Sequence, residues 1–291
     1  MTLYARLVPA AVRLRLRPHL QRALEVSGLI GVLHRRQERR LAQAPAPPFD
    51  DDLPMPPAEL LVLVGASSDG RWFSEGGREH AAMFSSLAGK HGVDVGKAAD
   101  VWDLGCGCGR IARWLAPQVI AGGGAFTGSD INRRLVDWTS AHLPGRYLLN
   151  GLKTPTSLAP KSKDLVYAYS VLTHLREKAV RAWLEEVHRV LRPGGLALLT
   201  FHDECYAGAW GPPGVVGRLE REPFIVLNDA MEGSNYLSSW TTAVHLEALA
   251  APLFEVLEIV RDDGTIRPRR SRCCGRVPSD RGERGGDVAF A

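Results

Sequence analysis

The sequence predicts an α/β fold, a doubly wound and mostly parallel sheet, preceded by an N-terminal helical extension. From residue 58 onward, short apolar runs alternate with helical patterns, which is the order of a sheet covered by helices on both faces. A glycine-rich turn follows the first apolar run, as expected at the ligand-binding edge of such a sheet. With 45% hydrophobic and 23% charged residues, the 291-residue chain has an ordinary composition for a protein with a buried core.

The first part of the chain is basic and helical in pattern. Residues 1–40 contain nine arginines against two acids, Glu25 and Glu38, and we expect residues 1–42 to form a solvated helical extension. Contact with a membrane surface or with RNA is the alternative for this segment. Residues 43–57 are rich in proline and form a predicted linker.

Cysteine content and hydropathy point to a cytoplasmic protein. The five cysteines are odd in number and form no disulfide-like framework, which fits a reducing compartment. Cys106 and Cys108 lack a second ligand pair at a suitable spacing, so we expect no metal site. No stretch approaches the roughly 20 apolar residues needed to span a bilayer.

A single domain is predicted for residues 58–262. Its expected helices lie at residues 57–64, 77–91, 109–115, 132–142, 176–191 and 242–253. Its expected strands lie at residues 100–104, 125–129, 146–149, 164–169, 196–201 and 254–260. Residues 202–240 form a long, aromatic-rich connection that we interpret as a lid-like insertion. Residues 263–291 show no periodicity and are predicted to be a poorly ordered basic tail.

The strongest motif is the loop after the first strand. Asp103 ends an apolar run, and Gly105, Gly107 and Gly109 follow at intervals of two. A dinucleotide site needs a third glycine where this chain has Arg110. A carboxylate at position 103 would also repel a pyrophosphate, whereas it suits a ligand with ammonium and sulfonium groups. The loop therefore favours S-adenosylmethionine over NAD.

Asp130 supports the same choice. It ends the second strand, somewhat over 20 residues past the first glycine, where a carboxylate can accept hydrogen bonds from both ribose hydroxyls. The alternative is that Asp130 only caps the helix that follows.

With these motifs the chain resembles the class I S-adenosylmethionine-dependent methyltransferases, in the group with a Gly-Cys-Gly-x-Gly-Arg loop. The resemblance covers about residues 57–260 and includes four further stretches, at residues 73–77, 150–152, 164–175 and 187–195. It implies that S-adenosyl-L-methionine is bound by Asp103, Gly105, Cys106, Gly107, Gly109, Asp130, Ile131, Asn150 and Ser170. The chain departs from the family at Asn150, where an acid is common, and at its C-terminal end, where the closing hairpin strand lacks a clear pattern.

Two histidines are candidates for catalysis. His174 follows the fourth strand and His202 follows the fifth, and the near-neutral pKa of imidazole suits a general base. His174 could instead pack on the next helix, and His202 and Asp203 could simply begin a polar loop. His188 lies mid-helix, away from the strand ends, and is interpreted as structural.

These observations predict a methyltransferase that acts on a small-molecule, sugar or lipid-intermediate acceptor by in-line transfer. The alternatives are an RNA or protein methyltransferase that uses the basic N-terminus, and a cofactor-binding protein without activity. Nothing in the domain resembles a nucleic-acid-binding module, so we expect no nucleic-acid partner.

Overall fold

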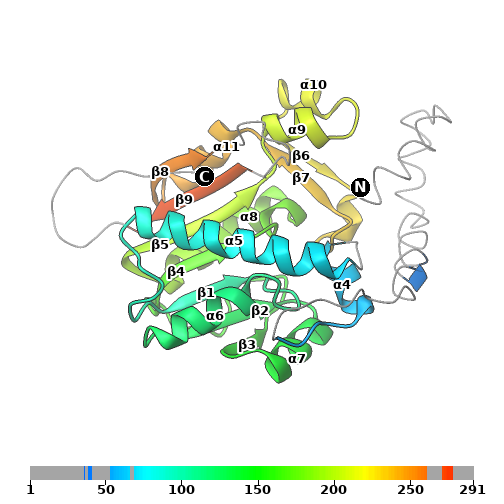
Figure 1. Cartoon of the computed structure of the whole chain (residues 1–291). Helices are drawn as coiled ribbons and strands as arrows, with labels where there is room; N and C mark the ends of the chain where they lie inside the picture. The colour runs from blue at the N-terminus through cyan, green and yellow to red at the C-terminus, as the bar shows by residue number, and fades with distance from the viewer. Residues whose placement is uncertain (1–35, 37–38, 41–52, 66–68, 261–270, 278–291) are drawn as a thin grey trace.

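A computed structural model describes residues 36, 39–40, 53–65, 69–260 and 271–277, with the side chains of 271–276 left out. Its centre is a seven-stranded sheet in the order β3-β2-β1-β4-β5-β9-β8 (Figure 1). Five strands run parallel, and β9 is antiparallel to both of its neighbours. The seven strands are β1 Val101–Leu104, β2 Phe126–Asp130, β3 Arg146–Leu149, β4 Lys163–Ala168, β5 Leu191–Phe201, β8 Glu255–Val260 and β9 Ser271–Arg276.

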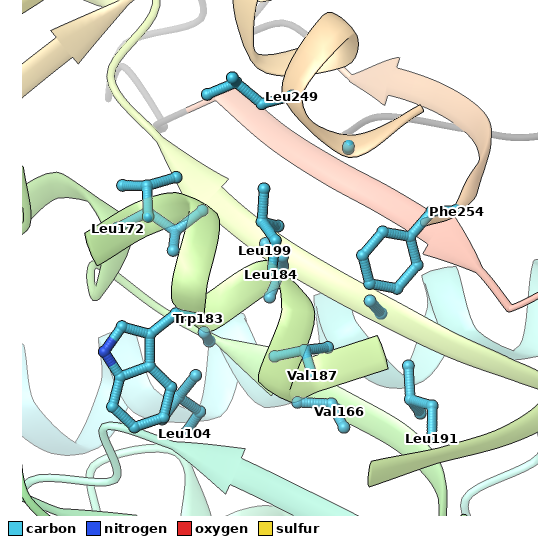
Figure 2. Close-up of a cluster of buried hydrophobic side chains, with 14 of the residues drawn as sticks. Leu104, Val166, Leu172, Trp183, Leu184, Val187, Leu191, Leu199, Leu249 and Phe254 are labelled. Carbon is cyan, nitrogen blue, oxygen red and sulfur yellow. The ribbon is translucent and has the colours of Figure 1, made fainter. Parts of the chain in front are cut away.

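Helices cover both faces of this sheet, which confirms the predicted doubly wound α/β class. One face packs against α5 Gly70–Lys90, α6 Ala112–Ala121 and α7 Arg133–His142. The other face packs against α8 Glu177–Val190 and α11 Ala243–Ala250. Figure 2 shows this second layer, in which Leu184 and Val187 of α8 meet Val166 and Leu199 of the sheet. The short helix α4 Ala58–Gly65 packs beside the start of α5 (Figure 1).

Residues 202–240, the predicted lid-like insertion, have secondary structure of their own. They form α9 Glu204–Trp210, α10 Val215–Leu219, the 3-10 turn η2 Asp229–Met231 and the antiparallel hairpin of β6 Phe224–Leu227 and β7 Ser238–Thr241. Ala207, Val215, Leu219, Ile225 and Trp240 give the insertion a small core. The segment is therefore a subdomain attached to the sheet and not an irregular loop.

Several boundaries differ from the sequence-based expectation, and β5 begins at Leu191, five residues before its predicted start. The tail at residues 263–291 was expected to lack order, but β9 pairs with β5 and β8 along Ser271–Arg276, so this prediction is wrong for that segment. Helix α5 begins at Gly70, seven residues early, because Asp69 caps it by accepting a hydrogen bond from the Arg71 amide. Helix α6 begins at Ala112, since residues 109–111 still belong to the glycine-loop turn.

The N-terminal prediction falls almost entirely outside the described residues. Within residues 1–42 the structure describes Arg36, Arg39 and Arg40, which are helical and exposed. The linker at residues 43–57 is described only from residue 53. No helix among the described residues is long and apolar enough to cross a bilayer.

Candidate cofactor and acceptor site

The carboxyl ends of β1, β2, β3 and β4 meet at one edge of the sheet because these strands are parallel. This edge brings together Asp103, the glycine loop, Asp130, Asn150 and Ser170. The sequence placed each of them at a strand end, and the structure puts those ends on neighbouring strands.

The glycine loop makes a tight turn that needs its glycines. Gly105, Gly107 and Gly109 have φ values of +78°, +57° and +83°, in the left-handed region that disfavours side chains. A Cβ at Gly105 would lie 2.3 Å from a methyl of Val171, and one at Gly109 would lie 2.1 Å from a methyl of Leu143. The loop therefore packs tightly against the turn after β4 and against the residue that follows α7.

Asp130 bonds the glycine loop to the second strand. Its Oδ2 accepts a hydrogen bond from the Gly107 amide at 2.9 Å, and its Oδ1 accepts one from the Asn132 amide at 2.8 Å. The side-chain cap of α7 comes from Asn132, which accepts from the Arg134 amide. Since an ionised carboxylate has about four acceptor sites, Asp130 keeps acceptor capacity for ribose hydroxyls.

Asp103 is a deeply buried carboxyl group at the end of β1, only 2% exposed. The pKa of Asp103 is raised to about 7, chiefly by burial; Tyr167 and Arg110 lower the pKa, and the charge of Asp130 raises it, within that net value. The Oδ2 atom of Asp103 is buried and has no hydrogen-bond partner among the described residues. Such an atom is costly unless a donor meets it, and an ammonium group would supply one.

Asn150 carries a second buried acceptor of this kind. Its Nδ2 donates to the Gly151 carbonyl at 2.9 Å, while its buried Oδ1 has no partner in the described part of the chain. The two open acceptors, on Asp103 and Asn150, follow β1 and β3, on either side of the strand that carries Asp130. The two acceptors need hydrogen-bond donors from a ligand. S-adenosylmethionine has such donors, an ammonium group at one end and an adenine amino group at the other.

The two loop cysteines are packing residues. Cys106 and Cys108 are buried, and burial raises the pKa of both thiols well above the ordinary range, so they stay protonated. No group of three or more His, Cys, Asp or Glu side chains with metal-binding geometry occurs in residues 53–65 and 69–260.

A cationic and aromatic cluster beside Asp103 was not predicted from the sequence. The Arg110 guanidinium lies 4.8 Å from the Tyr169 ring centroid and 5.1 Å from that of Trp72. Both of its terminal nitrogens lie 3.1 Å from His80 Nδ1, and the His80 ring is 4.3 Å from Tyr169. Trp72 and His80 come from α5, whose packing on the glycine loop no local sequence pattern indicates. Phe73, in the stretch 73–77 of the resemblance, is fully buried in the cluster around α4.

The two candidate catalytic histidines have different surroundings. His174 is partly buried, with Nδ1 2.7 Å from the Leu237 carbonyl and Nε2 3.2 Å from Ser170 Oγ. Because a carbonyl only accepts, Nδ1 carries the proton in neutral His174, and the Nε2 lone pair faces Ser170. Ser170 itself has a φ of +66°, a strained backbone for a residue with a side chain.

His202 lies in the core of the insertion. It is 5% exposed, its ring stacks on Tyr206 at 4.6 Å, and Trp240 lies at the same distance. Its Nδ1 lies 3.1 Å from the Ser239 carbonyl. His188 packs edge-on against Phe254, away from the site.

Comparisons with known proteins point to methyltransferases. A family model described as a methyltransferase domain matches residues 101–195. An uncharacterized methyltransferase of Synechocystis sp. is 26% identical over 160 residues, covering 54% of this chain and 74% of that protein.

Two solved structures share the fold. An S-adenosylmethionine-dependent methyltransferase from Mesorhizobium loti superposes with a TM-score of 0.52 at 18% identity, covering 66% of this chain and 96% of that one. The 1,6-didemethyltoxoflavin-N1-methyltransferase of Burkholderia thailandensis, solved with bound substrate and S-adenosylhomocysteine, has a TM-score of 0.50 at 18% identity and covers 80% and 94% of the two chains. The family model identifies a methyltransferase domain within the chain, and the sheet order agrees with a class I S-adenosylmethionine-dependent methyltransferase.

Proposed function

We propose that this enzyme methylates a hydroxyl group of a small-molecule acceptor, with His174 as the general base. The observation that carries the proposal is the pair of contacts that fix His174, Nδ1 to the Leu237 carbonyl and Nε2 to Ser170 Oγ. They turn the basic nitrogen toward Ser170, which follows β4, the strand that pairs with the Asp103-bearing β1.

The cofactor residues divide the binding work in this proposal. Asp103 accepts from the ammonium group, Asp130 from the ribose hydroxyls, and Asn150 from the adenine amino group. Ile131 is 41% exposed at the end of β2 and supplies an apolar surface for the adenine ring. When bound, S-adenosylmethionine supplies an electrophilic methyl group on a sulfonium.

His174 would take the proton that the acceptor hydroxyl loses when its oxygen is methylated. The carbon–sulfur bond of the cofactor would break as the carbon–oxygen bond forms, and S-adenosylhomocysteine would leave. His174 Nε2 holds the incoming proton, and the Leu237 carbonyl stabilises the imidazolium because it already accepts the Nδ1 proton. Ser170 would keep the imidazole ring in register until the acceptor hydroxyl replaces it as the partner of Nε2. His202 was the other candidate, but its ring is packed between Tyr206 and Trp240, so we assign it no role in proton transfer.

A small acceptor is supported by the enclosure of the site. The insertion packs over the turn that carries His174, and hydrogen bonds join that turn to Gly233 and Leu237, between η2 and β7, and to Ser239 of β7. An enclosed site excludes water and suits a small molecule better than a folded macromolecule. The Burkholderia protein of similar fold is named as a methyltransferase for 1,6-didemethyltoxoflavin, which is compatible with this choice.

The test is a comparison of His174→Gln with wild type, using a panel of small hydroxylated acceptors. We expect His174→Gln to lower kcat by about 10²- to 10⁴-fold, the usual range for a lost general base. Binding of S-adenosylhomocysteine should stay unchanged in the same variant. His188→Gln, a remote histidine, is the control and should keep wild-type kcat. Equal turnover by wild type and His174→Gln would show that His174 is not the general base.

A further inference from the structure

One segment of the insertion reaches past the acceptor side to the cofactor side. Residues 228–237, here called the strap, connect β6 to β7 and include η2. Asn228 closes the strap on itself, since its Nδ2 donates to the Tyr236 carbonyl at 2.8 Å. The strap is therefore an ordered loop with a defined course.

The tip of the strap lies on two apolar side chains at the ends of β2 and β3. A Cβ at Gly233 would lie 3.0 Å from Ile131 Cδ1 and 3.0 Å from Leu152 Cδ1. Ile131 is the residue that the proposed function places against the adenine ring. Gly233 also has a φ of +80°, so both its backbone and the space around it favour glycine.

Three groups of polar contacts hold the strap in this position. The Gly233 amide donates to the His174 carbonyl at 3.0 Å, while the Leu237 carbonyl accepts from His174. Arg176 pairs with Asp229 at 2.5 Å, donates through its Nη2 to the Asp229 carbonyl at 2.9 Å, and through its backbone amide to Glu232 at 2.8 Å. At the far side, Asn235 Nδ2 donates to the Leu63 carbonyl of α4.

We infer that the strap forms the outer wall of the adenine side of the cofactor site, with Gly233 as its contact residue. The inference rests on the proposed placement of adenine beside Ile131. It assigns to the insertion a second role, because the same ten residues touch the adenine-side surface and the proposed base. Cofactor held under the strap would then dissociate only when the contacts of Arg176 and Asn235 open.

The experiment measures dissociation of S-adenosylhomocysteine from full-length protein by stopped flow or surface plasmon resonance. Gly233→Ala adds a methyl group against Ile131 and Leu152 and strains a left-handed backbone, so the strap should lift. We expect about tenfold faster dissociation with a smaller change in association, as is usual for a lost contact. Arg176→Gln, which removes the ion pair without adding bulk, should also speed dissociation.

Two glycines of the same insertion provide matched controls. Gly214 has a φ of +87° with nothing within 4 Å of its Cβ position, and Gly217 has open space in α10. Gly214→Ala reproduces the backbone strain without the contact, and Gly217→Ala reproduces neither. Both should release S-adenosylhomocysteine at the wild-type rate. If Gly233→Ala releases S-adenosylhomocysteine at the same rate as Gly214→Ala, the strap does not form a wall of the cofactor site.

Hydrogen exchange gives a readout that needs no variant. Binding of S-adenosylhomocysteine to the wild-type protein should slow exchange at residues 228–237 and leave residues 204–219 unchanged. Unchanged exchange at residues 228–237 in the saturated complex would contradict the role of the strap but not the placement of the cofactor. A wild-type protein that binds no S-adenosylhomocysteine would overturn the cofactor placement as well, while loss of the His174 role would show only in turnover.

Discussion

Asp103 is a carboxyl group held in the protein interior at a pKa of about 7, chiefly because burial disfavours its charged form. The unfolded chain would ionise it at about 3.9. Between these two values the native state binds more protons than the unfolded state, so this group makes the free energy of unfolding fall as pH rises through the window. A buried ammonium would reverse the balance by favouring the ionised carboxylate.

Cofactor binding should therefore depend on pH through Asp103. We expect the Kd of S-adenosylhomocysteine to fall as pH rises from 6 to 8. At pH 6, binding of the ligand should release up to one proton from Asp103. Calorimetry in two buffers of different ionisation enthalpy measures that proton directly. Asp103→Asn should bind more weakly and lose the pH dependence. A wild-type Kd that is flat over this range would show that Asp103 is already ionised in the free enzyme.

The sequence predicted the positions of Asp103, Asp130, Asn150 and the glycines because each follows a strand whose end is visible in the pattern. It could not predict the cluster of Arg110, Trp72, Tyr169 and His80, since that cluster depends on how α5 lies across the loop. Nor could it separate His174 from His202, because both follow strands and only tertiary packing distinguishes them.

At the scale of elements, the contact of α5 with the glycine loop depends on one missing side chain. A Cβ at Gly77 would lie 2.0 Å from the Arg110 carbonyl oxygen, which is backbone and cannot move freely. We expect Gly77→Ala to lower the free energy of unfolding by about 2 kcal/mol or more through overpacking. Because the displaced backbone belongs to the loop, binding of S-adenosylhomocysteine should weaken too.

Gly89 in the last turn of the same helix is the matched control. It has nothing within 4 Å of its Cβ position and its backbone is helical. Gly89→Ala should raise the free energy of unfolding by about 0.5 kcal/mol, since alanine loses less backbone entropy in a helix. Urea denaturation of both variants tests the pair. Equal effects would show that helix propensity and not the loop contact decides the outcome at Gly77.

Strand β9 illustrates why the tail was mispredicted. The stretch Ser271–Arg276 contains no apolar alternation that would signal a strand. It pairs nonetheless because β5 and β8 offer backbone donors and acceptors on both sides, and these are satisfied whatever the side chains are. Backbone pairing of this kind leaves little trace in composition.

Truncation tests how much the strand contributes. A chain ending at Val260 lacks β9 and leaves the edges of β5 and β8 unpaired, so its melting temperature should fall by about 10 °C or more. A chain ending at Val277 keeps β9 and the two backbone bonds that Val277 makes with Gly194 and Gly195. It should melt close to the full-length value. Similar melting of the two truncated chains would show that β9 adds little stability.

At the scale of the whole molecule, the order of strands and helices was predictable from the alternating pattern. The parallel part of the sheet and the two helical layers follow from it by the handedness of such connections. The architecture of residues 202–240 was not predictable from the sequence. Its strands and helices of four to seven residues contain too few periods of the hydrophobic pattern to be detected.

Binding of the cofactor should stabilise the molecule as a unit. At a concentration 100 times its Kd, S-adenosylhomocysteine should add about 2.7 kcal/mol to the free energy of unfolding. For a domain of this size that corresponds to a rise in melting temperature of roughly 5–10 °C. NADH at the same concentration should produce no shift, because Asp103 and Arg110 do not form a pyrophosphate site. Differential scanning fluorimetry measures both, and an equal shift with NADH would reopen the choice of nucleotide.

The place of β9 in the sheet has a consequence for biosynthesis. Among the strands that the structure describes, β9 comes last along the chain, yet it inserts between two strands that are translated earlier. While the ribosome is still extending the chain, β5 and β8 have no partner on their facing edges, and such exposed edges invite association with other nascent chains. β9 must therefore emerge from the exit tunnel before the sheet can close, so the sheet reaches its native topology only after β9 has been synthesised.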